Sequence, residues 1–438
     1  MEKAAASVSS PSRMEPVLDF CVELSRRMIV SGANLERVVL AIERVCHAYG
    51  LHDLSVYLLS TYLSVSARDE QGNYIARQVS IPTVLIHLAR LKQLNRLSYR
   101  VVAQTPDPDT LWELLEEASA AKDYHDWIIL LGQLCAAACL CLIFGGGLRE
   151  LLPVLLIMAE MHLLARLMEK LSLDRIVCSV ITMWAATVTA IGLMALGISS
   201  NGTIILITVS MLMIPGIPLV NAVRNLLCGN EMNGILQIFK ATTETLALAM
   251  GIYLGIILLG QGYATGGELS TVQLPALLLI GLSFLASASF GVVFRIPWKD
   301  LWLAGLGGAL TRIALIVLGT RLSSRMLYVT VAALLASLYA ELLATKRKDP
   351  STYFLYPAII PLIPGDLFYY AIEGLYAGNW TMLTENGCNC LLTLLAMSIG
   401  FVLSSIIAHY TRRMRNRKLI RLPGKTSAIH NSHAESQS

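Results

Sequence analysis

The segment IPGIPLVNAVRNLLCGN at residues 214–230 decides how this chain is organised. A second segment, IPGDLFYYAIEGLYAGN at residues 363–379, aligns with it without a gap and matches at seven of seventeen positions. The matches include a Pro-Gly pair near the start and a Gly-Asn pair at the end, which shared hydrophobicity does not explain. The two segments therefore indicate an internal repeat.

Each copy of the repeat predicts a break inside a membrane-spanning helix. Pro lacks the backbone N–H donor and Gly weakens a helix, so the breaks are expected at Pro215-Gly216 and Pro364-Gly365. Paired Gly/Pro-interrupted spans in corresponding halves of a chain are a sequence marker of a transporter binding site. We therefore expect these four residues to border a substrate site.

The composition is that of an integral membrane protein. The 438 residues are 55% hydrophobic and only 15% charged, compared with about 25% charged in soluble domains. The net charge of +4 is small, and the basic surplus lies in the C-terminal tail, so no nucleic-acid partner is expected. The nine cysteines form no metal-binding pattern, the first residues contain no apolar signal segment, and no cofactor is expected.

Composition and hydropathy divide the chain into five parts. The predicted parts are a disordered lead (1–13), a cytoplasmic α+β domain (14–126), a first five-helix membrane module (127–260), a second five-helix membrane module (272–411) and a basic, disordered cytoplasmic tail (412–438). Within the α+β domain, β-rich runs flank a turn at Glu70-Gln71-Gly72-Asn73, which indicates a hairpin.

Hydropathy predicts ten membrane-spanning α-helices. Their approximate limits are 127–148, 151–168, 175–197, 203–226, 241–260, 272–294, 300–319, 326–345, 352–377 and 390–410. The broken spans are the fourth and the ninth, and this odd offset means that the two copies cross the bilayer in opposite directions. The expected fold is therefore a pair of inverted five-helix repeats, which gives alternating access about a midplane site.

The charge bias of the loops predicts the orientation. Loops on the side of both termini carry Lys170, Arg175, Arg295, Lys299 and the basic run 346–348, whereas the opposite loops carry Arg149, Arg321 and Arg325. The positive-inside rule then places both termini in the cytoplasm and the chain in the inner membrane.

Ionisable side chains inside spans are costly and are functional candidates by default. Asp366 and Arg312 are the deepest, at the same depth, so an ion pair between them is possible, either as part of a site or as simple neutralisation. Glu244 and Glu341 lie nearer the cytoplasmic ends. We expect proton coupling among these four residues.

Polar groups after the first break suggest how a substrate would be held. The free N–H groups of the half-helix after Gly216 are expected to receive a substrate carboxylate, assisted by Asn221, with Arg224 and Asn225 one turn further on. Asp366 opens the other half-helix. It is expected either to pair with the substrate ammonium or a proton, or to cap that helix.

Residues 14–126 contain no nucleophile elbow, P-loop or dinucleotide-binding fingerprint. The chain is therefore not expected to be an enzyme, and the soluble domain is expected to gate or regulate the membrane part.

Several stretches resemble the bacterial threonine/serine exporter family in its fused, single-chain form. They are SGANLERVVLAIERVCHAYGL (31–51), LNRL (94–97), IPGIPLVNAVRNLLCGNEMNG (214–234) and PAIIPLIPGDLFYYAI (357–372). The resemblance covers about residues 15–410 and implies a proton-coupled antiporter that exports threonine and serine. Asn225 and Asn230 stand where the family would lead us to expect acidic residues, which shifts the proton-coupling role toward Asp366, Glu244 and Glu341.

Three alternatives remain open at this point. Two-part relatives have been linked to export of small dicarboxylates such as succinate, so a dicarboxylate is the rival substrate. A membrane-anchored enzyme and a sensor that uses the N-terminal domain are the rivals from other classes. The expected partners are a small-molecule substrate, protons and the lipid bilayer, and a homo-oligomer is possible.

Overall fold

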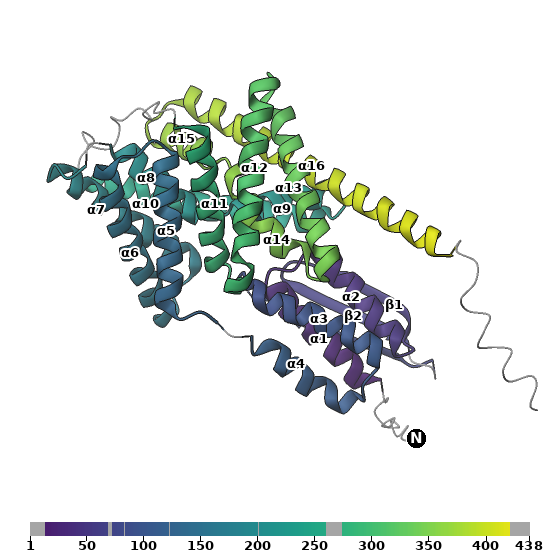
Figure 1. The fold of residues 1–438 in the computed structure, drawn as a ribbon. Helices are drawn as coiled ribbons and strands as arrows, with labels where there is room; N and C mark the ends of the chain where they lie inside the picture. The colour runs from purple at the N-terminus through teal and green to yellow at the C-terminus, as the bar shows by residue number, and fades with distance from the viewer. Residues whose placement is uncertain are drawn as a thin grey trace, which may run out of the picture.

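The computed structural model describes residues 14–420, except 69–71, 83, 122, 200 and 260–273. The predicted lead, the tail after residue 420 and part of the predicted hairpin turn lie outside the described residues. Figure 1 shows a small α+β domain at one end of a larger set of helices.

The N-terminal domain places helices on one face of a three-stranded antiparallel sheet. Its helices are α1 (Glu15–Val30), α2 (Leu35–Ala48), α3 (Leu88–Gln104) and α4 (Leu111–Ser119), and its strands are β1 (His52–Leu58), β2 (Tyr62–Arg68) and β3 (Tyr74–Ser80), in the order β1-β2-β3. Alternate residues of β2, namely Leu63, Val65 and Ala67, are fully buried in the core that includes α1 and α2. The expected sheet and helices are confirmed.

Local chemistry fixes the helix starts in this domain. Asn34 caps α2, because its side chain accepts a hydrogen bond from the backbone N–H of Glu36. Helix α3 begins at Leu88, because His87 caps it by accepting from the N–H of Arg90.

The first set of membrane helices follows the N-terminal domain. It consists of α5 (Asp126–Ile143), α6 (Leu148–Lys170), α7 (Arg175–Ala195), α8 (Gly202–Met213), α9 (Gly216–Leu227) and α10 (Glu231–Leu259). The second set consists of α11 (Ala276–Val293), α12 (Leu301–Arg321), α13 (Arg325–Arg347), α14 (Ser351–Ala358), a 3₁₀ turn (Ile360–Leu362), α15 (Gly365–Tyr376) and α16 (Trp380–Ile420).

Within the described residues, eight helices are long and apolar enough to cross a membrane, and the bent pair α8–α9 counts as a ninth. The ninth predicted span, 352–377, corresponds to α14, the 3₁₀ turn and α15, which are not among these helices. The reason is local, since three prolines in this stretch (Pro357, Pro361 and Pro364) divide it into short pieces.

Two other predicted limits differ from the structure. Helix α10 starts at Glu231 and α16 at Trp380, each nearly three helical turns before the predicted span, and α16 continues to Ile420. Hydropathy reports the length of chain suited to lipid, whereas a helix continues wherever its backbone hydrogen bonds continue.

The two sets of helices pack in the same pattern. In the first set α7 packs on α10, α5 on α6 and α9 on α10; in the second set α13 packs on α16, α11 on α12 and α15 on α16. The sets meet through α5 and α11, which also correspond by position in the chain.

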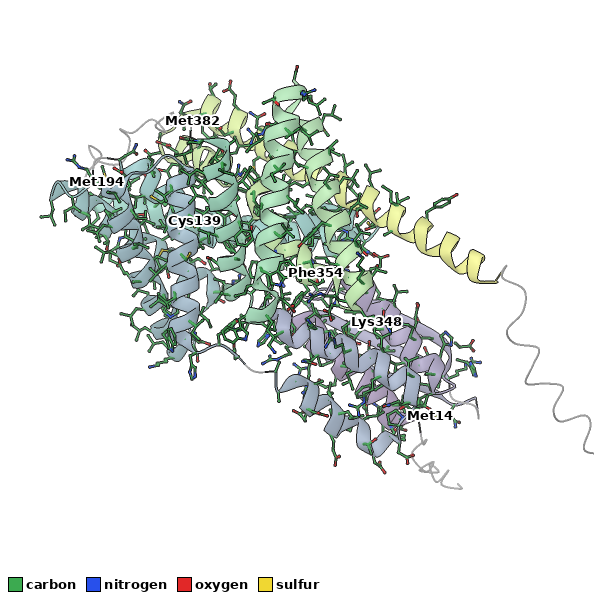
Figure 2. The ribbon with its side chains drawn as sticks, in the orientation of Figure 1. Met14, Cys139, Met194, Lys348, Phe354 and Met382 are labelled. Carbon is green, nitrogen blue, oxygen red and sulfur yellow. The ribbon has the colours of Figure 1, made fainter. Side chains whose placement is uncertain are left out.

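The N-terminal domain marks one end of the helices. Figure 2 shows Lys348, at the end of α13, beside this domain, and Met194 and Met382 at the opposite end. Because α12 and α13 are connected at that opposite end, Arg321 and Arg325 also lie there.

Candidate functional site

Both predicted helix breaks are present and have the same backbone geometry. Pro215 has φ −75° and ψ 58°, and Pro364 has φ −79° and ψ 62°. The N–H of Gly216 donates to the carbonyl of Ile214 at 2.7 Å, and that of Gly365 donates to the carbonyl of Ile363 at 2.9 Å. Each break is therefore an inverse γ-turn centred on proline, and α8 and α9 meet at 55° across the first one.

The two breaks lie against each other. A Cβ added to Gly216 would lie 2.7 Å from Cγ2 of Ile363, at the second break. A Cβ added to Gly365 would lie 2.6 Å from Cγ of Met211, just before the first break. The absence of a side chain at each glycine thus allows the other break to approach closely.

A cavity of about 430 Å³ adjoins the second break, within the range of small-molecule sites. Its walls come from the ends of helices that lie away from the N-terminal domain. The lining residues are Leu140, Ile143, Phe144, Met211, Ser283, Ala286, Arg312, Leu315, Ile316, Gly319, Arg325, Tyr328, Val329, Ile360, Pro361, Leu362, Ile363, Pro364, Asp366 and Thr393.

The cavity contains the two deepest charges predicted from the sequence, Arg312 and Asp366. Nε of Arg312 donates to Oγ of Ser283 at 2.8 Å. In the described part of the chain, Asp366 has no ion-pair or hydrogen-bond partner, and no ion pair joins it to Arg312. The two charges therefore share a cavity without neutralising each other directly, and Asp366 does not cap α15.

The polar residues after the first break have other partners and do not line this cavity. Nδ2 of Asn221 donates to the hydroxyl of Tyr356 at 3.2 Å. Arg224 donates to Oγ of Ser405 at 3.2 Å, and Nδ2 of Asn225 donates to Oε1 of Gln237 at 3.1 Å. Pro215 and Gly216 are buried beside the second break.

The remaining acidic candidates also lie outside the cavity lining. Glu244 forms an ion pair with Arg175 at 3.2 Å. Glu341 forms one with Arg37 of the N-terminal domain at 2.8 Å. Both carboxylates thus have a basic partner at the end of the molecule that carries the N-terminal domain.

Sequence reasoning missed several polar groups of the cavity. Ser283, Tyr328 and Thr393 stand alone in apolar helices, where single hydroxyl groups are common, and nothing in the sequence distinguished them. Arg325 was counted only as a loop charge; its position at the first residue of α13 was the available signal.

These features describe a polytopic membrane protein with two broken helices around a partly polar cavity, an arrangement typical of secondary transporters. Residues 19–259 match the family model ThrE, described as "Putative threonine/serine exporter", and residues 279–407 match a second model, "Threonine/Serine exporter, ThrE". The chain belongs to the ThrE threonine/serine exporter family and carries both of its modules.

A relative from Mycobacterium tuberculosis, named "Probable threonine/serine exporter", is 25% identical over 416 residues, which cover 90% of this chain and 76% of the relative. No solved structure matches this chain. The first family match ends at residue 259 and the second begins at residue 279.

Proposed function

We propose that this protein exports threonine, serine or a closely related amino acid, and that the cavity beside the second break is the substrate site. One observation carries the proposal: Arg312 and Asp366 line the same cavity and have no direct ion pair with each other. An uncompensated charge within a span is costly. A zwitterionic amino acid would supply one carboxylate for the arginine and one ammonium group for the aspartate.

The contacts of Arg312 suit a carboxylate ligand. Its Nε is held by Ser283, and a guanidinium has two further nitrogens that can bind a carboxylate at two points. Ser283 is fully buried, so it fixes the direction of the guanidinium. Asp366 would then bind the ammonium group, and the substrate side chain would contact other residues of the cavity wall, which include Leu315, Tyr328 and Thr393.

We infer that the membrane part consists of two inverted five-helix repeats, with the α14–α15 stretch as the ninth of ten spans. Three observations support this inference: the matching turns at Pro215 and Pro364, the matching helix contacts, and the reciprocal packing of Gly216 and Gly365. Related repeats can exchange conformations, which is the basis of alternating access.

The positive-inside rule gives this arrangement an orientation. With the N-terminal domain and the tail in the cytoplasm, the cavity would lie toward the outer side of the inner membrane. We assign proton coupling to Asp366, because Glu244 and Glu341 are held in ion pairs away from the cavity.

A dicarboxylate is the second candidate substrate, because the cavity also contains Arg325. Two guanidinium groups match two carboxylates, whereas a zwitterion requires one cation and one anion. Arg325 is exposed at the cavity wall, while Arg312 is half-buried, so the two arginines can be tested separately.

Purified protein in liposomes, offered labelled threonine, serine and succinate in turn, tests the proposal. We expect uptake of the two amino acids, its loss in Arg312→Gln, and its retention in Arg325→Gln. Uptake of succinate alone, lost in both variants, would replace the amino-acid assignment by the dicarboxylate. No uptake of any of the three by the wild-type protein would refute both.

A further inference from the structure

A buried cluster of charges joins the N-terminal domain to the membrane helices. Nζ of Lys92, on α3, lies 2.8 Å from Oδ2 of Asp300 and 3.0 Å from Oδ2 of Asp349. The side chain of Asp349 is 0% exposed, and those of Lys92 and Asp300 are 11% and 10% exposed. Asp300 precedes α12 and Asp349 lies between α13 and α14, so one lysine holds the ends of three helices.

Further groups contact both carboxylates. Arg96, one turn along α3, lies 3.0 Å from Asp349. Arg347 lies 2.6 Å from Asp300, and the hydroxyl of Tyr353 donates to Asp300 at 2.8 Å. We call Lys92, Asp300 and Asp349 the clamp. Buried ion pairs contribute little net stability but are costly to leave half-formed, so the clamp favours two states, fully closed and fully open.

A second contact links the N-terminal domain to both broken spans. The hydroxyl of Tyr356, on α14, donates to the carbonyl of Gly32 at 3.3 Å and accepts from Asn221, on α9, at 3.2 Å. Gly32 lies in the turn between α1 and α2, and Tyr356 is only 4% exposed. A single buried hydroxyl therefore connects the domain with the half-helix before the second break and the half-helix after the first.

The position of these contacts relative to the cavity suggests their role. The cavity lies at the end away from the N-terminal domain, whereas the clamp and Tyr356 lie at the end that bears it. Any separation of α9 from α14 at this end would break the link through Tyr356. We propose that the N-terminal domain is the gate of the transporter on its own side, held shut by the clamp and Tyr356. This inference rests on the proposed transport function.

The gate can be tested without measuring transport. Thr352→Cys places a thiol in buried α14, where the threonine hydroxyl has no partner among the described groups. In a cysteine-free full-length protein, a membrane-impermeant maleimide is applied from the domain side. Lys92→Met should raise the labelling rate on the order of tenfold, a typical coupling between two conformational states.

Arg100→Met is the matched control, because Arg100 is exposed on the same helix and hydrogen-bonds only to Gln104 among the described residues. It should leave the labelling rate unchanged. Equal rates in Lys92→Met and Arg100→Met would contradict the proposal.

A crosslink tests the same gate in a protein whose clamp is intact. Arg37 of α2 and Glu341 of α13 form an ion pair across the interface at 2.8 Å. In Arg37→Cys/Glu341→Cys, a short bifunctional thiosulfonate should stop threonine transport in liposomes, and a reductant should restore it. Undiminished transport by the crosslinked protein would show that this interface does not open. If the wild-type protein transports no threonine, the proposed function is refuted. The labelling experiment does not depend on transport, so it still tests whether the N-terminal domain acts as a gate.

Discussion

Replacing Gly216 by alanine tests the close approach of the two helix breaks. The new Cβ would lie 2.7 Å from Cγ2 and 3.2 Å from Cδ1 of Ile363, whereas ordinary contacts begin at 3.4 Å. Ile363 is β-branched and has little rotamer freedom, so the backbone of one break must move. Overpacking of this kind costs about 1–3 kcal/mol. We expect Gly216→Ala to destabilise the folded protein by that amount.

Two further variants provide the matched controls. Gly365→Ala places its Cβ against Met211, whose flexible side chain can move away, so it should be less costly. Gly281→Ala, on α11, meets nothing within 4 Å and should be neutral, or stabilising by up to about 1 kcal/mol, since alanine favours a helix over glycine.

Unfolding titrations of the purified protein in mixed micelles measure these differences. Ile363→Ala removes the opposing atoms, and in a double-mutant cycle it should recover most of the cost of Gly216→Ala, with a coupling of about 1–3 kcal/mol. Additive effects of the two substitutions would refute the contact between the breaks, as would equal stability of Gly216→Ala and Gly281→Ala.

Three other outcomes are expected. In a cysteine-free background, Ser323→Cys should react with an impermeant thiol reagent in intact cells and Glu117→Cys should not; the reverse pattern would invalidate the charge-bias orientation. Burial, followed by the nearby charge of Arg90, lowers the pKa of His87 to about 4, so protein stability should fall between pH 6.5 and about 4 by up to about 3 kcal/mol. His87→Gln should flatten this melting profile, and an unchanged slope would show that another group titrates. Arg312→Lys should impair threonine transport strongly because an ammonium cannot reproduce two-point binding, and wild-type kinetics in this variant would count against a carboxylate at that position.

The breaks could be predicted from the sequence because their cause is local. Proline and glycine act on their own backbone, and the same turn recurs at Pro215 and Pro364. The small sheet followed from β-rich runs on either side of a turn. The span limits agree with the helices to within a few residues except where α10 and α16 extend beyond the apolar stretch.

The composition of the site could be predicted only in part. Depth along a helix placed Arg312 and Asp366 at the same level, and both line the cavity. The depth of a residue in the membrane does not say which side of its helix it lies on. The sequence therefore did not show that Asn221 would contact Tyr356 or that Arg224 would contact Ser405. The charge cluster at the helix ends could not be predicted either. In the sequence Asp300 and Asp349 resemble solvated loop charges, and their burial depends on the packing of α3 against them.

The central claim is that Asp366 binds the substrate ammonium in the cavity, and Asp366→Asn tests it most directly. The substitution retains the size of the side chain and removes its charge, and the measurement is exchange of labelled for unlabelled threonine across liposomes. Exchange involves no net proton movement, so it separates substrate binding from proton coupling. The account predicts that exchange is abolished while protein amount and melting temperature are maintained. Exchange at the wild-type rate would contradict the assignment.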